Sequence, residues 1–153
     1  MKYIEGELVV TDCRVFRTNI DWRDFALEVD VRFLEGTIST AEWWLHFRDP
    51  GESSGLDHIL TLSDNGNVRI SLAKRTGGHD SAHFDNVALS NNQTNHILLI
   101  AKGNRFAFYL NGQPLHYAES DALRFGMSWF DATGEVAMDN FKIWDISDIP
   151  ELP

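Results

Sequence analysis

Hydrophobic and polar residues alternate along several short stretches of this chain. The clearest case is FALEVDVRF, residues 25–33, in which every second side chain is apolar. Successive side chains of a β-strand point to opposite faces of a sheet, so this pattern predicts a strand with one buried and one solvated face.

The segment AEWWLHFRD, residues 41–49, alternates in the same way but has two very different faces. One face is wholly apolar and belongs in a core: Trp43, Leu45 and Phe47. The other face is polar and aromatic: Glu42, Trp44, His46 and Arg48. A row with an aromatic ring, an imidazole and a guanidinium is either a solvated outer surface or a binding surface. This strand is therefore the centre of the functional prediction.

Turn signals recur about every eight to twelve residues between the other alternating stretches, which is typical of an all-β sandwich or barrel. Further strands are predicted at residues 6–10, 14–16, 58–62, 67–72, 96–102, 105–110, 114–118, 124–130 and 135–146. The alternation slips at Asp139 and Asn140, which predicts a β-bulge. Residues 73–95 are predicted to be mostly irregular, with a short strand around residues 84–89. We expect two packed antiparallel sheets, a jelly-roll sandwich, in one domain spanning residues 1–153.

Charge and composition narrow the classes of partner. The formal net charge is −10. Because nucleic acids and anionic membranes attract basic surfaces, this charge argues against both and is compatible with neutral sugars or calcium. The chain lacks a run of about 18 apolar residues, and its first residues, MKYIEGELVV, do not form a signal peptide. We expect a cytoplasmic protein or a piece of a larger one. The single cysteine, Cys13, excludes an intramolecular disulfide.

The order of several segments resembles a known group of folds. DFALEVDVRFLEG, AEWWLHFRD, DNGNVRISL, LLIAKGNRFAFYLNGQPL and EVAMDNFKIWDI follow one another as in concanavalin-like and laminin-G-like jelly rolls. The resemblance covers nearly the whole chain and is strongest to the bacterial branch described as family-16-glycoside-hydrolase-like or 3-keto-disaccharide-hydrolase-like. Members of this broad group bind sugars, proteins or calcium, or hydrolyse glycans, so the resemblance implies a fold rather than one function.

The catalytic motif of family-16 glucanases is incomplete in this chain. That motif, Glu-x-Asp-x-x-Glu, supplies the two carboxyl groups that retaining hydrolysis needs about 5–5.5 Å apart. Glu28 and Asp30 match its first two positions, but the third falls on Phe33, or on Leu34 in the bulged variant. Because Arg32 shares their face, we interpret these residues as a surface charge ladder and favour a protein without catalytic activity.

The polar face of residues 41–49 fits a carbohydrate platform. Sugar rings pack their C–H faces on aromatic rings and offer hydroxyl groups to forked donors, so we expect Trp44, His46 and Arg48 to bind a glycan. Neighbouring strands are predicted to extend the platform with four further residues: His58, Arg69, Ser71 and Trp129. The leading prediction is a non-catalytic, lectin-like module.

Other interpretations stay open beside this one. Trp44 would alternatively pack under residues 73–95, with His46 and Arg48 as ordinary surface. A sandwich also exposes sheet edges and a broad face, so the second hypothesis is a structural or protein-interaction domain or a homodimer. The third is a glycoside hydrolase or lyase with an unfamiliar site that uses Glu42 and Asp49 beside His46.

Two segments suggest metal ions. By resemblance, Asp139 and Asn140 occupy the place near the last strand where many sugar-binding jelly rolls hold a structural calcium, with Asp12 or Asp24 approaching from the N-terminal side. An equally good interpretation gives Asn140 only the bulge conformation. Separately, GGHDSAHFD at residues 77–85 spaces His and Asp residues like zinc ligands, and its alternative is a polar loop.

Overall fold

The computed structural model describes residues 2–17, 22–34, 41–49, 57–85, 87, 93–122 and 127–150. The regular structure of these residues is entirely β-strand, and the strands pair antiparallel, which confirms the predicted all-β class. The strands are β1 (Lys2–Ile4), β2 (Glu7–Arg17), β3 (Phe25–Phe33), β4 (Glu42–Asp49), β5 (His58–Ser63), β6 (Val68–Ala73), β7 (His79–Phe84), β8 (Asn95–Lys102), β9 (Arg105–Leu110), β10 (Gln113–Glu119) and β11 (Met127–Asp145). Within the described ranges, no helix is long and apolar enough to cross a membrane.

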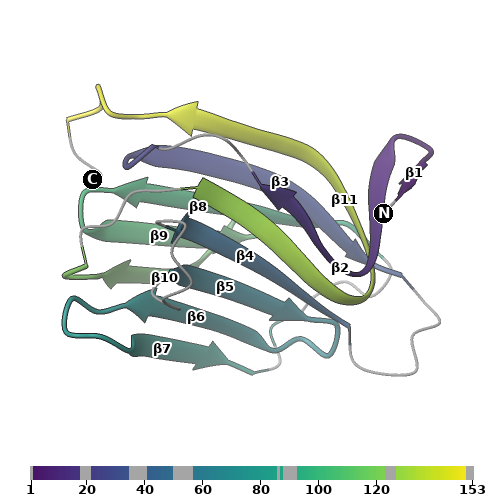
Figure 1. Cartoon of the computed structure of the whole chain (residues 1–153), viewed down its shortest axis with the longest axis horizontal. Helices are drawn as coiled ribbons and strands as arrows, with labels where there is room; N and C mark the ends of the chain where they lie inside the picture. The colour runs from purple at the N-terminus through teal and green to yellow at the C-terminus, as the bar shows by residue number, and fades with distance from the viewer. Residues whose placement is uncertain are drawn as a thin grey trace.

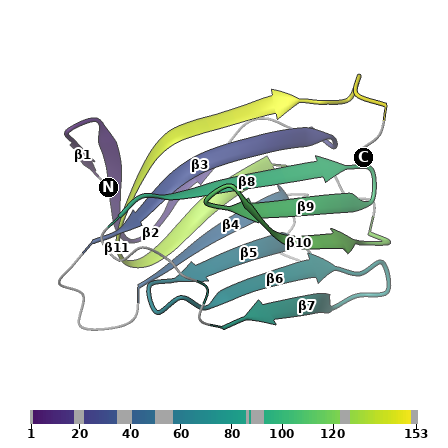
Figure 2. The same cartoon turned by 180° about the vertical axis from the view of Figure 1, so that it is seen from behind.

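The strands form two layers that share the long strand β11. Along the hydrogen-bonded path the order is β10-β9-β8-β3-β11-β4-β5-β6-β7, and β2 lies beside β11. Residues 127–133 of β11 pair with β4, and residues 136–145 pair with β3. Figure 1 shows β11 bending between these two parts, close to β2, and Figure 2 shows the bend from behind. We call β11-β4-β5-β6-β7 the first sheet and β10-β9-β8-β3-β11 the second sheet.

The core lies between the inner faces of the two sheets. In β3 every second residue from Phe25 to Phe33 is buried, as the alternation predicts. Ring contacts join β4 to β9, since the Phe47 centroid lies 5.9 Å from that of Phe106 and 6.1 Å from that of Phe108. The described strands therefore form the predicted two-sheet jelly-roll sandwich.

Several strands differ from the prediction in their bounds. β2 and β11 are each continuous where two strands were expected. β7 lies in the stretch predicted to be irregular, because its residues pair with β6 from Val68 to Ala73. The predicted bulge is confirmed, since the register of β11 on β3 shifts after Asp139 and Asn140 has a φ of 51°. Of the predicted connections, residues 35–40 and 50–56 lie outside the described residues, as do 86 and 88–92.

Candidate functional site

The outer face of the first sheet carries a row of side chains that crosses five strands. Successive partners in the backbone register are Asp131, Trp44, Thr61, Arg69 and His83. Directly paired residues point to the same side of a sheet and have Cβ atoms about 4.5–5.5 Å apart. The row therefore places a carboxylate, an indole, a hydroxyl, a guanidinium and an imidazole side by side, on the face opposite the core. We call this surface the Trp44 face.

A second row lies two residues away on each strand, towards the same edge of the face. Its members in register are Trp129, His46, Ile59, Ser71 and Ser81. The hydroxyl oxygens of Ser71 and Ser81 lie 2.9 Å apart. The structure thus brings His46 and Ser71, as predicted, beside Trp44 and Arg69. The backbone of Trp129 lies in register with His46, and its side chain is outside the described part of the chain.

His46 is held at this face by Asp57. The Nδ1 atom of His46 contacts the Oδ2 atom of Asp57, and the two side chains are 14% and 12% exposed. A ring nitrogen of His79, Nε2, donates to the backbone carbonyl of Asp57 at 2.9 Å. Burial raises the pKa of the Asp57 carboxyl, but the hydrogen bond and charge of His46, together with the backbone N–H of Asp57 and the charge of His79, leave that pKa lowered. The pair fixes the orientation of the imidazole at the edge of the Trp44 face.

Asp57 was missed by the sequence analysis. Asp57 is the last residue of the polar stretch DPGESSGLD, residues 49–57. Nothing in the sequence distinguishes it as a binding residue from the other carboxylates and hydroxyls of that stretch. The only signal in the sequence was the position of Asp57 directly before β5. Because β5 pairs with β4, the residue before β5 lies close to His46.

Arg48 does not lie on the Trp44 face, so its predicted placement is wrong. Its side chain is 0% exposed and points to the second sheet. Its Nε–H donates to the carbonyl of Arg23 at 2.9 Å, and its Nη1–H donates to the carbonyl of Gly103 at 2.8 Å. The backbone of Arg48 has a φ of 51°, which ends the regular alternation, so that Phe47 and Arg48 are both buried.

The charge of Arg48 is balanced inside the sandwich. Burial lowers the pKa of its guanidinium to about 10, while the Asp24 carboxylate, 3.8 Å away, favours the charged form. The guanidinium therefore stays charged at neutral pH and acts as a clamp between the sheets, not as a donor to an outside ligand.

His58 also lies in the core, so its predicted place in the platform is wrong. It pairs in register with Phe47 and is 0% exposed. Its ring centroid lies 5.0 Å from that of Phe106, and its Nδ1 accepts the backbone N–H of Ala73 at 2.9 Å. The signal was present in the sequence, since Leu60 and Leu62 follow at a period of two and face the core.

The charge ladder of β3 lies on the outer face of the second sheet, as predicted. His96 Nδ1 lies 2.8 Å from an oxygen of Asp30, and Asn140 Nδ2 donates to the other Asp30 oxygen at 2.8 Å. Arg32 pairs with Glu7. These partners support the interpretation of the ladder as surface ion pairs.

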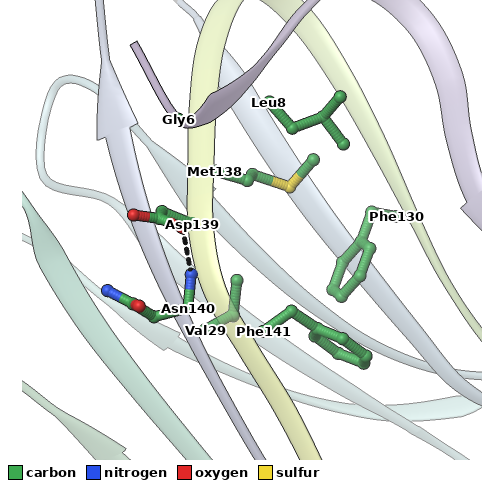
Figure 3. A pocket seen from close by; sticks show the side chains of 8 residues that line it. All are labelled: Gly6, Leu8, Val29, Phe130, Met138, Asp139, Asn140 and Phe141. Carbon is green, nitrogen blue, oxygen red and sulfur yellow. Dashed lines mark hydrogen bonds between the residues drawn. The ribbon is translucent and has the colours of Figure 1, made fainter. Parts of the chain in front are cut away.

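A small pocket of about 150 Å³ lies at the β11 bulge. Its lining is mostly apolar and consists of Gly6, Leu8, Val29, Phe130, Met138, Asp139, Asn140 and Phe141. Figure 3 shows Phe130 and Phe141 on one side of the β11 ribbon and Asp139 and Asn140 on the other. The bulge thus turns Phe141 towards the apolar side and leaves Asp139 at the rim.

Two of the predicted calcium ligands, Asp139 and Asp24, lie far apart in the structure. Asp139 Oδ1 accepts the backbone N–H of Asn140 at 2.7 Å. Asp24 precedes β3 and pairs with Lys102 at 3.0 Å, six residues from the β3 residue opposite Asp139, which is about 20 Å along a strand. Across the described ranges, no group of three or more His, Cys, Asp or Glu residues is arranged to hold a metal ion. Calcium at Asp139 stays a prediction.

No family model and no curated protein matches the sequence of this chain. Solved structures do match its fold. Sheep galectin-11, solved in complex with glycerol, matches with a TM-score of 0.70 at 11% identity and covers 86% of this chain and 98% of its own. The carbohydrate-binding module CBM66 from Bacillus subtilis matches with a TM-score of 0.68 at 16% identity, over 92% of this chain and 83% of its own.

A third solved structure, a native glycosidic hydrolase, has a TM-score of 0.71 at 9% identity and covers 94% of this chain and 80% of its own. At such identities the likeness concerns the fold, and the expected family-16-like branch stays a prediction. By its strand order and by these matches, the chain has the concanavalin-like jelly-roll sandwich fold.

Proposed function

We propose that the chain is a non-catalytic carbohydrate-binding module that holds a neutral glycan on the Trp44 face. The observation that carries this proposal is the five-strand row in which Trp44 lies between Asp131 and Thr61, with Arg69 next in line. An indole offers a large rigid surface to the C–H face of a sugar, while carboxylate and guanidinium groups accept from and donate to its hydroxyls.

The dimensions of the face favour a ligand of more than one sugar unit. Trp44 and Arg69 lie two strands apart, a separation of about 10 Å. A single ring stacked on Trp44 would leave Arg69 and His83 unused, whereas a short oligosaccharide lying across the strands reaches from Trp44 over the buried Thr61 to Arg69 and His83. The net charge of −10 favours a neutral ligand over an anionic one. Galectins and a carbohydrate-binding module among the structures of similar fold support the same function.

Binding is favoured over catalysis because the described carboxylates of this face have structural partners. Glu42 accepts the hydroxyl of Ser63 at 3.2 Å and Asp57 holds His46. Hydrolysis would require two carboxyl groups that face the substrate, one as general acid and one as base or nucleophile. Carboxylates that hold other protein groups are less suited to these roles.

A glycan array tests the proposal. Wild-type protein, the Trp44→Ala variant and an Ile149→Ala control would be applied with calcium and with a chelator. We expect the wild type and the control to bind a defined set of neutral glycans and Trp44→Ala to lose them. Equal binding by Trp44→Ala would contradict the Trp44 face as the site. No selective binding by the wild type would contradict the module and favour a protein-interaction domain. Binding that needs calcium would support an ion at Asp139.

A further inference from the structure

The outer face of the second sheet carries an apolar row that the Trp44 face does not involve. Its members in register, from β11 through β3, β8 and β9 to β10, are Trp144, Ala26, Ile100, Ala107 and Tyr117. We call this row the Tyr117 stripe. It crosses five strands and is therefore about 19 Å long.

The two ends of the stripe are exposed aromatic rings. Tyr117 is 64% exposed and Trp144 is 43% exposed, and they are two of the three large apolar side chains that are exposed in the described part of the chain. Between these two rings the stripe consists of smaller side chains, those of Ala26, Ile100 and Ala107, which form an apolar floor. Aromatic rings at both ends of an apolar floor form a shallow trough, and an exposed apolar row of this kind often marks an interaction site.

Hydrogen-bonding groups border the trough at the Tyr117 end. The hydroxyl oxygens of Tyr109 and Tyr117 lie 3.1 Å apart, and their ring centroids are 6.1 Å apart at an angle of 89°. Arg105 and Glu119 form an ion pair at 3.2 Å. These residues, with Ile100, line a groove of about 540 Å³, within the range of ~300–1,000 Å³ that is usual for small-molecule sites.

We propose that the Tyr117 stripe is a second glycan-binding site, separate from the Trp44 face, which holds a neutral polysaccharide chain lying across the strands. Tyr117 and Trp144 each stack on a sugar ring near one end of the trough, and the apolar floor accommodates the rings between them. Tyr109, Arg105 and Glu119 supply donors and acceptors of both signs at the border, which suits hydroxyl groups and does not select a charged ligand.

A second copy of the chain fits this face less well. Two copies stacked face to face about a twofold axis, along or across the stripe, would place aromatic rings opposite aromatic rings and small residues opposite small ones. The rings would hold the floors apart, so that Ala26 and Ala107 would make no contact with the other copy. Good packing between two sheets needs interdigitation of large and small side chains.

Affinity electrophoresis in the Trp44→Ala background tests the proposal without the first site. Native gels would contain β-glucan, arabinoxylan, galactan or levan. We expect Trp44→Ala to be retarded in at least one gel and further substitution of Tyr117→Ala or Trp144→Ala to weaken that retardation at least tenfold. Ile149→Ala, an exposed apolar residue outside the stripe, is the matched control and should change nothing.

Retardation in none of these gels, or retardation that Tyr117→Ala does not alter, would overturn the second site. Light scattering of the wild type and of Tyr117→Ala tests the alternative occupant, a second copy of the chain. A wild-type dimer that becomes a monomer in Tyr117→Ala would assign the stripe to self-association. Tyr117→Phe keeps the ring and removes the hydroxyl, so it should retain stacking and lose part of the affinity. Loss of array binding in Trp44→Ala concerns only the first site, so the two proposals fail separately.

Discussion

The guanidinium carbon of Arg48 lies 4.9 Å from the centroid of the Phe106 ring, and this contact joins the end of β4 to β9 of the other sheet. The same guanidinium donates to the carbonyls of Arg23 and Gly103. Arg48 therefore donates to two backbone carbonyls between the two sheets. Its substitution is expected to lower the stability of the fold and not to act on ligand binding directly.

Arg48→Ala is predicted to lower the free energy of unfolding by about 2–5 kcal/mol, because it removes a fully buried side chain and the donors that it gives to the carbonyls of Arg23 and Gly103. Arg48→Lys should recover only part of the loss, since an ammonium does not reproduce the planar fork. Urea unfolding followed by tryptophan fluorescence measures both. Arg69→Ala, exposed on the Trp44 face, is the control and should change stability by less than about 0.5 kcal/mol. An Arg48→Ala protein as stable as Arg69→Ala would contradict the clamp.

The adjacent tryptophans of β4 are predicted to separate folding from binding. Trp43 is 0% exposed, stacks on Phe130 at 5.5 Å and donates its indole N–H to the sulfur of Met138 at 3.0 Å. Trp43→Ala should therefore cost about 3–5 kcal/mol. Trp44→Ala should cost about 1 kcal/mol or less of stability and weaken glycan binding at least about tenfold, which is 1.4 kcal/mol.

Denaturation curves of both variants, with titrations against the glycans found on the array, check this pair. If Trp44→Ala unfolds like Trp43→Ala, the outer indole is a structural residue. The alternative interpretation, in which Trp44 packs within the protein and not on a ligand, would then be favoured, and the Trp44 face would lose its aromatic platform.

The strands were predictable where one face is buried, and less so elsewhere. The alternation of β3 is complete because both of its neighbours and the opposite sheet impose it. Among the described strands β7 pairs with β6 alone, and it carries the polar sequence HDSAHF, so its residues give no apolar period even though they form a strand. An edge strand needs backbone partners more than it needs a buried face.

The composition of the Trp44 face was predictable in its centre but not at its ends. Trp44, His46, Arg69 and Ser71 share the outer face because the period of two holds from strand to strand. Arg48 leaves that face because its backbone enters the left-handed region, which no pattern of side chains indicates. Asp57 joins His46 through a contact between a loop and a strand, and such contacts depend on the chain path rather than on local periodicity.

Acid is predicted to remove the contribution of Asp24. Burial raises the pKa of this carboxyl, but the Gly103 N–H, Lys102 and Arg48 lower it more, so the pKa lies below its ordinary value in the folded protein. Such a group stabilises the fold above its unfolded pKa of about 3.9 and loses this effect as the pH falls through the folded value.

The stability difference between wild type and Asp24→Asn should therefore be about 1–3 kcal/mol at pH 7, be unchanged down to about pH 5 and shrink below about pH 4. Urea unfolding at a series of pH values measures it. Asp148→Asn, at an exposed carboxyl beyond the end of β11, is the control and should change stability by less than about 0.5 kcal/mol. A difference that persists undiminished at the lowest pH would contradict the ionised Asp24 as the source.

Two glycines with similar backbone angles are predicted to respond differently to a methyl group. Gly66 has a φ of 86° and Gly77 a φ of 95°, so alanine is strained at both. A Cβ on Gly66 would lie 2.6 Å from the carbonyl oxygen of Val87, whereas a Cβ on Gly77 meets nothing within 4 Å. The Gly66 carbonyl also accepts the Val87 N–H at 3.0 Å, so the two backbones cannot separate without losing that bond.

Gly77→Ala should cost about 1 kcal/mol from backbone strain alone, and Gly66→Ala should cost about 1–3 kcal/mol more because a backbone segment must move. Urea unfolding of both variants gives the difference, in which the strain common to the two turns cancels. Val87 packs against the core, so the extra loss at Gly66 should appear in the global unfolding transition and not as local fraying. Equal losses would show that the segment at Val87 yields freely to the new methyl group.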